Sequence, residues 1–335
     1  MDQPNRLSYL DILRGFAIIL VVGLHCYAYA FIDQKNGLGS FENFWMILSG
    51  AAVPIFFFVD GFLTARSQSR SVAPRFDEVV RKSARRLLVP WLIFNFIYVG
   101  LRALFEARGM FPTRLVVGQP IGVVLANIIG SRIAMQLYFL PALFVIRIAA
   151  VPLRHVARKP ILAFVAIWLG YIAMIRMAGV TLEGDPLSQA FFGFQYFLFG
   201  MLIYQIELID SRRWLGLLGL LALVAIAQAF FDLNANIEGF TYDIVKYGII
   251  AATYLASKWA IWDNSPLLWI GHRSMQIYLL HAPVLLKVVQ IIVAKVTREA
   301  LLRFALIWAL TVLLSVIITV LLARFPQSKR IFGEA

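Results

Sequence analysis

The feature that most constrains this chain is its first apolar segment, residues 10–32, which contains an arginine and a histidine. Arg14 and His25 are eleven residues apart. That spacing is three helical turns plus about 20°, so a helix places both on one face, roughly 16 Å apart along its axis. A charged side chain at membrane depth is costly and by default faces the bundle interior and serves a function. The pair therefore predicts a ligand or reaction path along one face of the first span.

The composition is that of an integral membrane protein. Hydrophobic residues make up 61% of the chain, the mean hydropathy is +0.80, and 15% of residues are charged. Spans of about 20 apolar residues account for such a composition. We expect an all-α, polytopic helix bundle forming one domain over residues 1–335, with no appended soluble domain. We place it in the cell membrane, inner or plasma, as a multi-pass protein in contact with membrane lipid.

Ten spans are predicted from the apolar runs, with residues 121–130 and 137–153 counted as one. They lie at about 10–32, 44–64, 87–104, 121–153, 160–178, 191–207, 214–230, 242–257, 267–286 and 302–322. Residues 121–130 are a short or re-entrant piece in this reading. The first segment loosely resembles a signal peptide, but Arg14 and His25 interrupt its long apolar run, so we interpret it as a span.

The distribution of lysine and arginine predicts the orientation. Seventeen of these residues lie in the loops on the side of the two termini, and seven lie in the opposite loops. Cytoplasmic loops carry the excess of basic residues, so both termini are predicted to be cytoplasmic. The formal net charge of +13 could indicate a nucleic-acid partner. We expect none, because the basic residues occupy short gaps between apolar runs, as the positive-inside rule describes.

The cysteine and histidine content limits the available chemistry. The single cysteine, Cys26, excludes an intramolecular disulfide and a cysteine-based metal cluster, and we predict no metal site. His281 lies about 14 residues into the ninth span, at a depth similar to that of His25. Ser274, Tyr278 and His281 follow i, i+4, i+7 spacing and share one helix face. These three residues are candidates for a catalytic or acceptor-side role, although either histidine could simply pack against backbone carbonyls.

Asp60 is a third ionisable residue inside the predicted spans. Counting residues from the same side places Asp60 and Arg14 at similar depth, and a buried acid needs a partner. We therefore predict an Asp60–Arg14 ion pair, with a structural role slightly favoured over a catalytic one.

The densest group of basic residues precedes the third span. It consists of Arg81, Lys82, Arg85 and Arg86, followed by Pro90. Such a group is an ordinary topology signal, but guanidinium groups also bind phosphate through paired hydrogen bonds. The spacing leaves both interpretations open.

Several segments resemble, in order along the chain, the motifs of the acyltransferase 3 family of membrane acyltransferases. They are residues 11–17 with Arg14-Gly15, ahead of His25; residues 54–63; Lys82 and Arg85 with Pro90 beyond; Tyr138-Phe139-Leu140; and Gly271, Ser274, Ile277-Tyr278-Leu279, His281 and Pro283. Each match alone is weak, but together they cover nearly the whole chain. One departure is Asp60, which stands where the family usually has serine.

The resemblance implies ten spans, a cytoplasmic acyl-CoA donor, commonly acetyl-CoA, and a hydroxyl acceptor on an envelope carbohydrate. It implies that Arg14 and His25 are essential and that Lys82 and Arg85 face the CoA phosphates. No bound cofactor is implied, because acyl-CoA is a co-substrate.

The residues and the resemblance together predict an acyl-CoA-dependent O-acyltransferase. His25 acts as general base or as an acyl carrier, with the general base favoured. The acceptor is a carbohydrate or a lipid-linked glycan. The alternative is a secondary transporter that uses buried Arg14, His25, Asp60 and His281 to bind substrate or relay protons.

Overall fold

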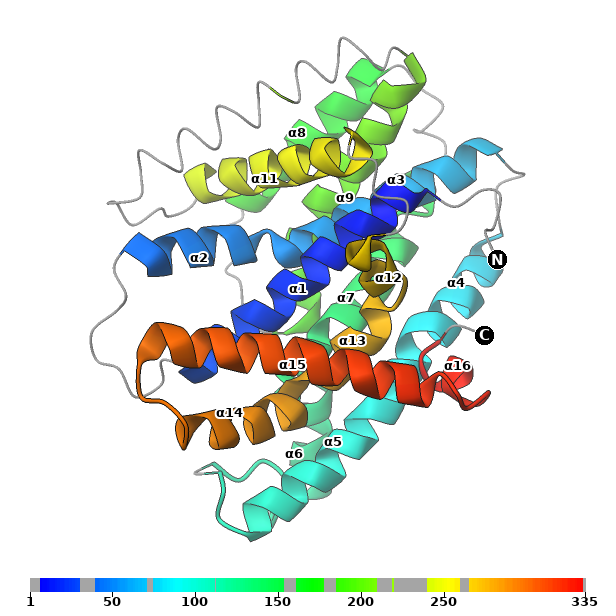
Figure 1. The fold of residues 1–335 in the computed structure, drawn as a ribbon. Helices are drawn as coiled ribbons and strands as arrows, with labels where there is room; N and C mark the ends of the chain where they lie inside the picture. Colours follow the sequence, from blue (N-terminus) through cyan, green and yellow to red (C-terminus); the bar gives the residue numbers. More distant parts are fainter. Residues whose placement is uncertain are drawn as a thin grey trace.

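The computed structural model describes residues 7–30, 40–70, 75–111, 113–153, 161–177, 185–209, 219, 240–259 and 265–333. Within these ranges the regular elements are all helices, which confirms the predicted all-α class. Most of the long helices run side by side across the molecule (Figure 1). The described ends of the chain, at the start of α1 and at α16, lie on the same side of the bundle (Figure 1).

Helix α1, Ser8–Ala30, lies at the centre of the bundle. It contacts α2 (Ser40–Gly50), α3 (Ala52–Arg70), α11 (Phe240–Trp259) and α15 (Ala300–Leu322). Its apolar side chains are mostly buried, including Leu13, Ile18 and Val22. A helix that is apolar on most of its surface and surrounded by others is the expected core element of a membrane bundle.

One pair of glycines allows two helices to approach at the level of their backbones. A Cβ on Gly61 of α3 would lie 2.0 Å from the carbonyl oxygen of Phe197, in α9 (Pro186–Ile209). A Cβ on Gly200 of α9 would lie 2.0 Å from the carbonyl oxygen of Phe58. Small residues at helix crossings are how membrane helices gain close packing without a hydrophobic driving force between them. This crossing fixes α3, and with it Asp60, against α9.

The third predicted span has an irregular start. Helix α4, Phe76–Ser83, continues through a π-helical turn, Ala84–Leu88, into α5, Val89–Ala107. Proline has no backbone N–H, so Pro90 cannot donate the α-helical hydrogen bond to residue 86, and helices commonly distort at such a position. The basic residues predicted to precede this span lie on α4 and on the π-helical turn.

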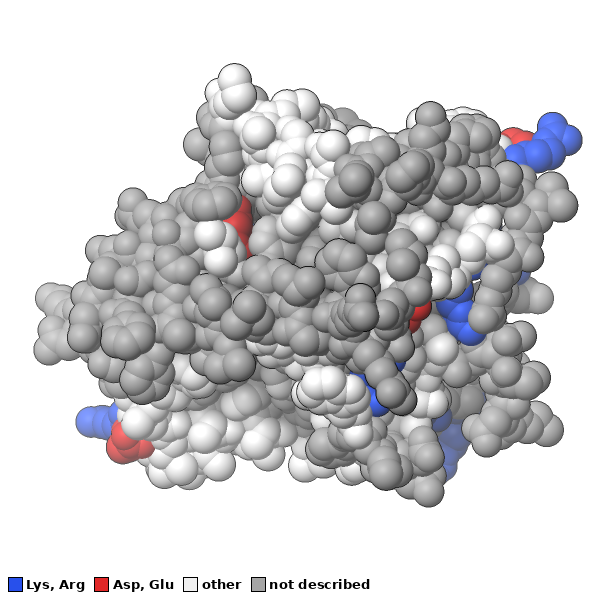
Figure 2. Space-filling view, turned by 90° about the horizontal axis from the view of Figure 1, so that it is seen from above, with Lys and Arg blue, Asp and Glu red and all other residues white. Residues whose placement is uncertain are grey.

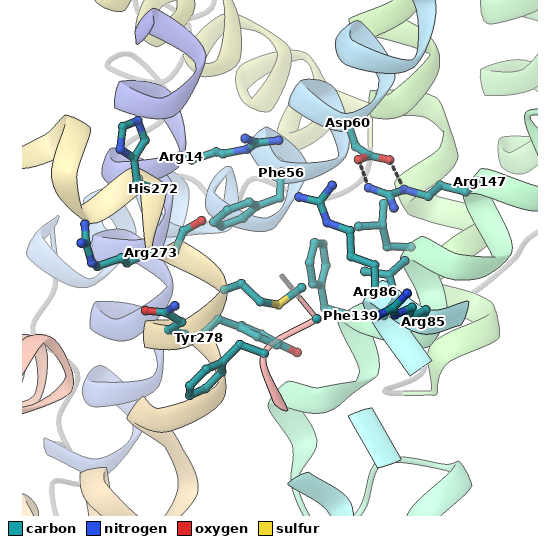
Figure 3. A pocket seen from close by; sticks show the side chains of 18 of the residues that line it. Arg14, Phe56, Asp60, Arg85, Arg86, Phe139, Arg147, His272, Arg273 and Tyr278 are labelled. Atoms are coloured by element: carbon teal, nitrogen blue, oxygen red, sulfur yellow. Dashed lines mark hydrogen bonds and ion pairs between the residues drawn. The ribbon is translucent and has the colours of Figure 1, made fainter. Parts of the chain in front are cut away.

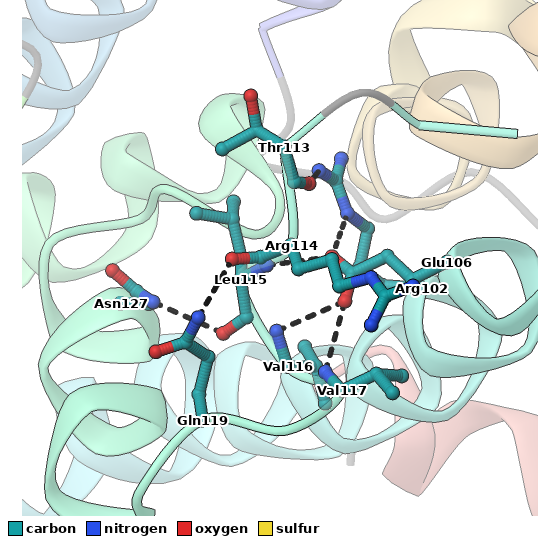
Figure 4. Close-up of polar contacts among 9 residues, drawn as sticks. All are labelled: Arg102, Glu106, Thr113, Arg114, Leu115, Val116, Val117, Gln119 and Asn127. Carbon is teal, nitrogen blue, oxygen red and sulfur yellow. Dashed lines mark hydrogen bonds and ion pairs between the residues drawn. The ribbon is translucent and has the colours of Figure 1, made fainter. Parts of the chain in front are cut away.

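The loop after α5 is organised by one buried carboxylate, Glu106 (Figure 4). It accepts hydrogen bonds from Arg102 Nε at 2.6 Å and from three successive backbone N–H groups, of Leu115, Val116 and Val117, at 2.8 to 3.1 Å. A buried charge is tolerated where such donors compensate it. This contact holds the chain as it turns toward α6, Ile121–Ile129.

Helix α6 is separate from α7, Phe139–Ala149, which follows a 3₁₀ turn at Met135–Tyr138. The short-segment interpretation of residues 121–130 is therefore correct. Helix α8, Ile161–Met177, packs on α9.

The ninth predicted span is broken into four pieces. They are α12 (Pro266–His272), α13 (Ser274–Leu280), a π-helical turn (His281–Leu285) and α14 (Leu286–Ala294). After α15, the chain turns back into the short helix α16, Ser328–Ile331. Broken helices are found at membrane depth where the irregular backbone is covered by protein or lines a cavity.

Six helical segments of the described residues are long and apolar enough to cross a membrane. They lie at Ser8–Tyr27, Phe41–Ser69, Phe76–Ala107, Pro186–Leu208, Ser274–Ala294 and Ala300–Leu322. Shorter apolar helices occur at Met135–Ala149 and Val165–Met174. The predicted span at 214–230, apart from residue 219, lies outside the described residues, as do the segments 31–39, 71–74, 154–160, 178–184, 210–213, 231–239 and 260–264. The count of ten spans therefore stays a prediction.

The charges seen on one face of the molecule gather mainly toward one edge. Figure 2 shows most of the coloured Lys and Arg atoms toward the right, which is also the side of α4 and of both described ends in Figure 1. This distribution agrees with the positive-inside pattern of the sequence, and the cytoplasmic assignment of that side stays a prediction.

Candidate functional site

A cavity of about 1110 Å³ lies between α1, α3, α4, α7, the α12–α13 junction and the segment after α15. Seven basic residues line it, together with two acidic residues, Asp60 and Glu78. The basic residues are Arg14, Arg81, Lys82, Arg85, Arg86, Arg147 and Arg273. Aromatic side chains line it as well, among them Phe56, Phe139 and Tyr278 (Figure 3). The cavity is therefore strongly positive in formal charge and partly aromatic.

All four residues of the predicted basic cluster, Arg81, Lys82, Arg85 and Arg86, line this cavity. Their side chains are exposed, so they project from the π-helical turn and α4 into open space. Concave surfaces of one charge concentrate ligands of the opposite charge. The cluster thus occupies a position suited to binding an anion.

Arg14 lines the cavity from α1 and donates to Asp11 Oδ1 at 3.0 Å. The other Asp11 oxygen lies 3.3 Å from Nε2 of His272, at the end of α12. The α1–α12 contact that brings these groups together depends on glycine: a Cβ on Gly271 would lie 1.7 Å from the carbonyl oxygen of Asp11. Direct backbone contact of the two helices therefore sets the position of Arg14.

The predicted Asp60–Arg14 ion pair does not form, because Asp60 pairs with Arg147 of α7 (Figure 3). Arg147 Nε donates to Asp60 Oδ2 at 2.8 Å, and its Nη2 donates to Oδ1. The side chain of Arg147 is 19% exposed and that of Asp60 is 9% exposed. The prediction was wrong because similar depth in the membrane does not decide whether Asp60 pairs with Arg14 or with Arg147. Packing of α7 beside the α3–α9 pair brings Arg147 to both carboxylate oxygens, whereas Arg14 is engaged by Asp11, three residues away on its own helix.

Tyr278 and Ser274 of α13 also line the cavity. The hydroxyl of Tyr278 donates to the backbone carbonyl of Gln136, and its ring meets that of Phe139 edge-on at 5.6 Å. The Gln136 side chain donates in turn to the carbonyl of Ala282. The 3₁₀ turn before α7 thus fixes the broken ninth span at the wall of the cavity.

The two histidines that were predicted to lie at matched depth are neighbours. The ring centroids of His25 and His281 are 5.3 Å apart. Nδ1 of His281 lies 2.7 Å from the carbonyl oxygen of Tyr278 and 3.2 Å from that of Ile277. Both oxygens can only accept, so Nδ1 carries the proton and Nε2 is the bare acceptor nitrogen. This Nε2 is buried and has no hydrogen-bond partner among the described residues.

The histidine pair lies beside the inner part of the cavity. Val21 lines the cavity and precedes His25 by one helical turn on the face that also carries Arg14. Tyr278 lines the cavity too, with its ring 6.1 Å from that of His281. His25 itself is partly exposed and is not among the cavity residues. The predicted stripe on α1 therefore follows the cavity wall from Arg14 to Val21 and ends at the two histidines.

The sequence interpretation missed Arg147, His272 and Arg273. Arg147 lies inside the predicted span at 137–153, so the rule that selected Arg14 and Asp60 would have selected it as well. His272 and Arg273 lie where the predicted ninth span breaks. Only the break turns them toward the cavity. Within the described residues, no group of three or more His, Cys, Asp or Glu side chains could hold a metal ion.

The fold and the site define a multi-pass helical membrane protein with a large cavity lined by basic side chains. The sequence profile of the acyltransferase domain family matches residues 7–324, which is nearly the whole chain. The chain belongs to this family, the acyltransferase 3 family that its motifs resemble. No curated protein and no solved structure matches the chain significantly.

Breaking the Asp60–Arg147 pair should destabilise the protein. Removing one member of a buried ion pair strands the other charge, at a cost of about 3–5 kcal/mol. Asp60→Ala and Arg147→Ala should each lower the thermal unfolding temperature of the detergent-solubilised protein, and their effects should be strongly non-additive in the double variant. Arg14→Ala serves as the control. If Arg14→Ala, rather than Arg147→Ala, shows the non-additivity with Asp60→Ala, the assignment of the pair is wrong.

Proposed function

We propose that the protein transfers an acyl group, by default acetyl, from acyl-CoA to a hydroxyl of an envelope or extracellular carbohydrate. Membership of the acyltransferase domain family supports an acyltransferase, and therefore argues against the secondary transporter. The observation that carries the choice of donor is the cavity itself, which extends from a basic wall to Val21 and Tyr278, the residues next to the histidine pair.

The donor is argued from charge and size. Coenzyme A carries several phosphate groups, and guanidinium groups bind phosphate through paired, charge-assisted hydrogen bonds. The basic cluster offers three arginines and one lysine on one wall. A volume of about 1110 Å³ slightly exceeds that of ordinary ligand sites, about 300–1,000 Å³, and suits a ligand as long as a nucleotide thioester.

In this proposal the phosphates bind at the basic cluster and the pantetheine arm extends past Arg14 and along the wall at Val21. The thioester then lies beside the histidine pair. His25 takes the proton of the acceptor hydroxyl as its oxygen attacks the thioester carbonyl. The new C–O bond forms, the C–S bond breaks, and the sulfur of CoA leaves and acquires a proton. The alternative, in which His25 carries the acyl group, requires an additional acyl-imidazole intermediate.

The direct test is CoA release by purified protein in detergent, given acetyl-CoA and isolated envelope glycans as acceptors. Wild-type protein should release CoA and add acetyl groups that mass spectrometry detects on the glycan. His25→Ala should lower the turnover about 10²–10⁴-fold, the usual contribution of a general base, and should still bind acetyl-CoA. Near-normal transfer by His25→Ala would remove His25 from the mechanism. Substrate uptake without CoA release would favour the transporter.

The basic cluster should act on donor binding more than on turnover. Lys82→Gln with Arg85→Gln removes two cationic contacts, which at about 1.5–3 kcal/mol each should raise the donor KM at least tenfold, with a smaller change in kcat. The control is Lys295→Gln with Arg298→Gln, which removes one lysine and one arginine charge from exposed residues outside the cavity. Equal donor KM values for the two double variants would reduce the cluster to a topology signal.

Amide replacements of His281 should distinguish its two nitrogens. The amide of glutamine reaches the position of Nε2 and supplies an oxygen that can accept a hydrogen bond there, while the amide of asparagine reaches only the position of Nδ1. If the bare Nε2 orients His25, His281→Gln should retain more kcat than His281→Asn, with similar donor KM values for both. Thermal unfolding checks that both variants are folded. If His281→Asn instead retains more kcat than His281→Gln, the role of His281 is to hold the break in the helix through Nδ1.

A further inference from the structure

The segment after α15 folds back onto the mouth of the cavity. The chain turns at residues 323–327 and forms α16, Ser328–Ile331, whose backbone is closed by hydrogen bonds from Ser328 N to Phe325 O and from Phe332 N to Ser328 O. Figure 1 shows α16 beside the start of α5. Ala323, Ser328, Phe332 and Gly333 all line the cavity. We call residues 323–333 the C-terminal strap.

The strap is anchored by one aromatic side chain. Phe332 is 3% exposed, and its ring centroid lies 5.8 Å from that of Phe94 in α5. Phe325, in the same segment, is 60% exposed and contributes no such anchor. Full burial of a phenylalanine stabilises by about 1.5–3 kcal/mol, which contributes to holding this segment in place.

Next to Phe332, Gly333 lies directly against the backbone of Arg86, one of the basic residues that line the cavity. A Cβ on Gly333 would be 2.4 Å from the carbonyl oxygen of Arg86 and 3.0 Å from the ring of Pro90. Gly333 also has φ of +70°, a conformation that costs other residues energy. Glycine is therefore required at position 333 for two reasons: a side chain has no space there, and the backbone conformation disfavours other residues.

This contact falls on the irregular start of the third span. The π-helical turn at Ala84–Leu88 carries both Arg85 and Arg86, and the regular α-helical pattern is interrupted there, with Pro90, which lacks an N–H, in the next turn. Contacts from a neighbouring segment help to hold the backbone of such an irregular turn and, with it, the direction of its side chains. The strap lies on the backbone of this turn, while the side chains of the turn face the cavity.

We infer that the C-terminal strap is a positioning element of the donor site, in which Phe332 and Gly333 hold the π-helical turn so that Arg85 and Arg86 face the donor. This inference rests on the proposed function, because it takes acyl-CoA as the ligand of the cavity. The strap makes no chemical contribution: it acts on donor affinity through the backbone of Arg86.

The test combines a docking assay with donor binding on the full chain. Ser328 is 6% exposed, so Ser328→Cys should react slowly with a water-soluble maleimide while the strap is docked. The native Cys26 is fully buried and should contribute little labelling of its own. Adding Phe332→Ala should speed the labelling, whereas adding Phe325→Ala should not. Donor binding is measured by titration of acetyl-CoA into purified protein.

Phe332→Ala and Gly333→Ala should each weaken acetyl-CoA binding about tenfold, the equivalent of one displaced phosphate contact, while kcat changes little. Phe325→Ala should bind as wild type does. Rapid labelling of Ser328→Cys in the otherwise native protein, or unchanged donor affinity in both strap variants, overturns the inference. If wild-type protein fails to bind acetyl-CoA at all, the proposed function falls and the inference falls with it. If wild-type protein binds acetyl-CoA and both strap variants bind it equally well, only the inference about the strap is overturned and the proposed function stands.

Discussion

The cost of placing charge inside a helical membrane bundle controls the arrangement of this protein. Each charged group at depth needs a partner or access to a polar space. Asp60 accepts hydrogen bonds from two nitrogens of Arg147. Arg14 pairs with Asp11, which also lies next to His272. These contacts link α3 to α7 and α1 to α12. Four of the helices that enclose the cavity are therefore ones that buried charges link in pairs.

Close backbone contact is the second requirement, because ion pairs of this kind form only when the helices are held at short range. The Gly15–Gly271 contact places α1 on α12, and the close approach at Gly61 and Gly200 places α3 on α9. In lipid the association of helices depends on such packing and on interhelical polar contacts. The glycines thus set the distances, and the ionic groups then select which partners meet.

The cavity joins two chemically different regions. One is basic and exposed, formed by the π-helical turn and α4, and suits an anionic ligand. The other is aromatic and leads to two adjacent imidazoles, of which His281 offers a bare, buried nitrogen. In an acyltransferase this separation allows binding energy gained far from the reacting bond to position the thioester, which is how remote contacts contribute to catalysis.

The sequence by itself determined the helical membrane class, the stripe from Arg14 toward His25, the basic cluster ahead of α5 and the common depth of His25 and His281. These properties follow from hydropathy and helical periodicity, which act along one helix. The tertiary structure alone decided that Asp60 meets Arg147, 87 residues away, that His272 meets Asp11, and that Gly333 lies on Arg86. Periodicity gives a residue its depth and its face but not its neighbour. The neighbour depends on which helices pack together, and here backbone contact at glycines and the breaks in two spans decided that packing.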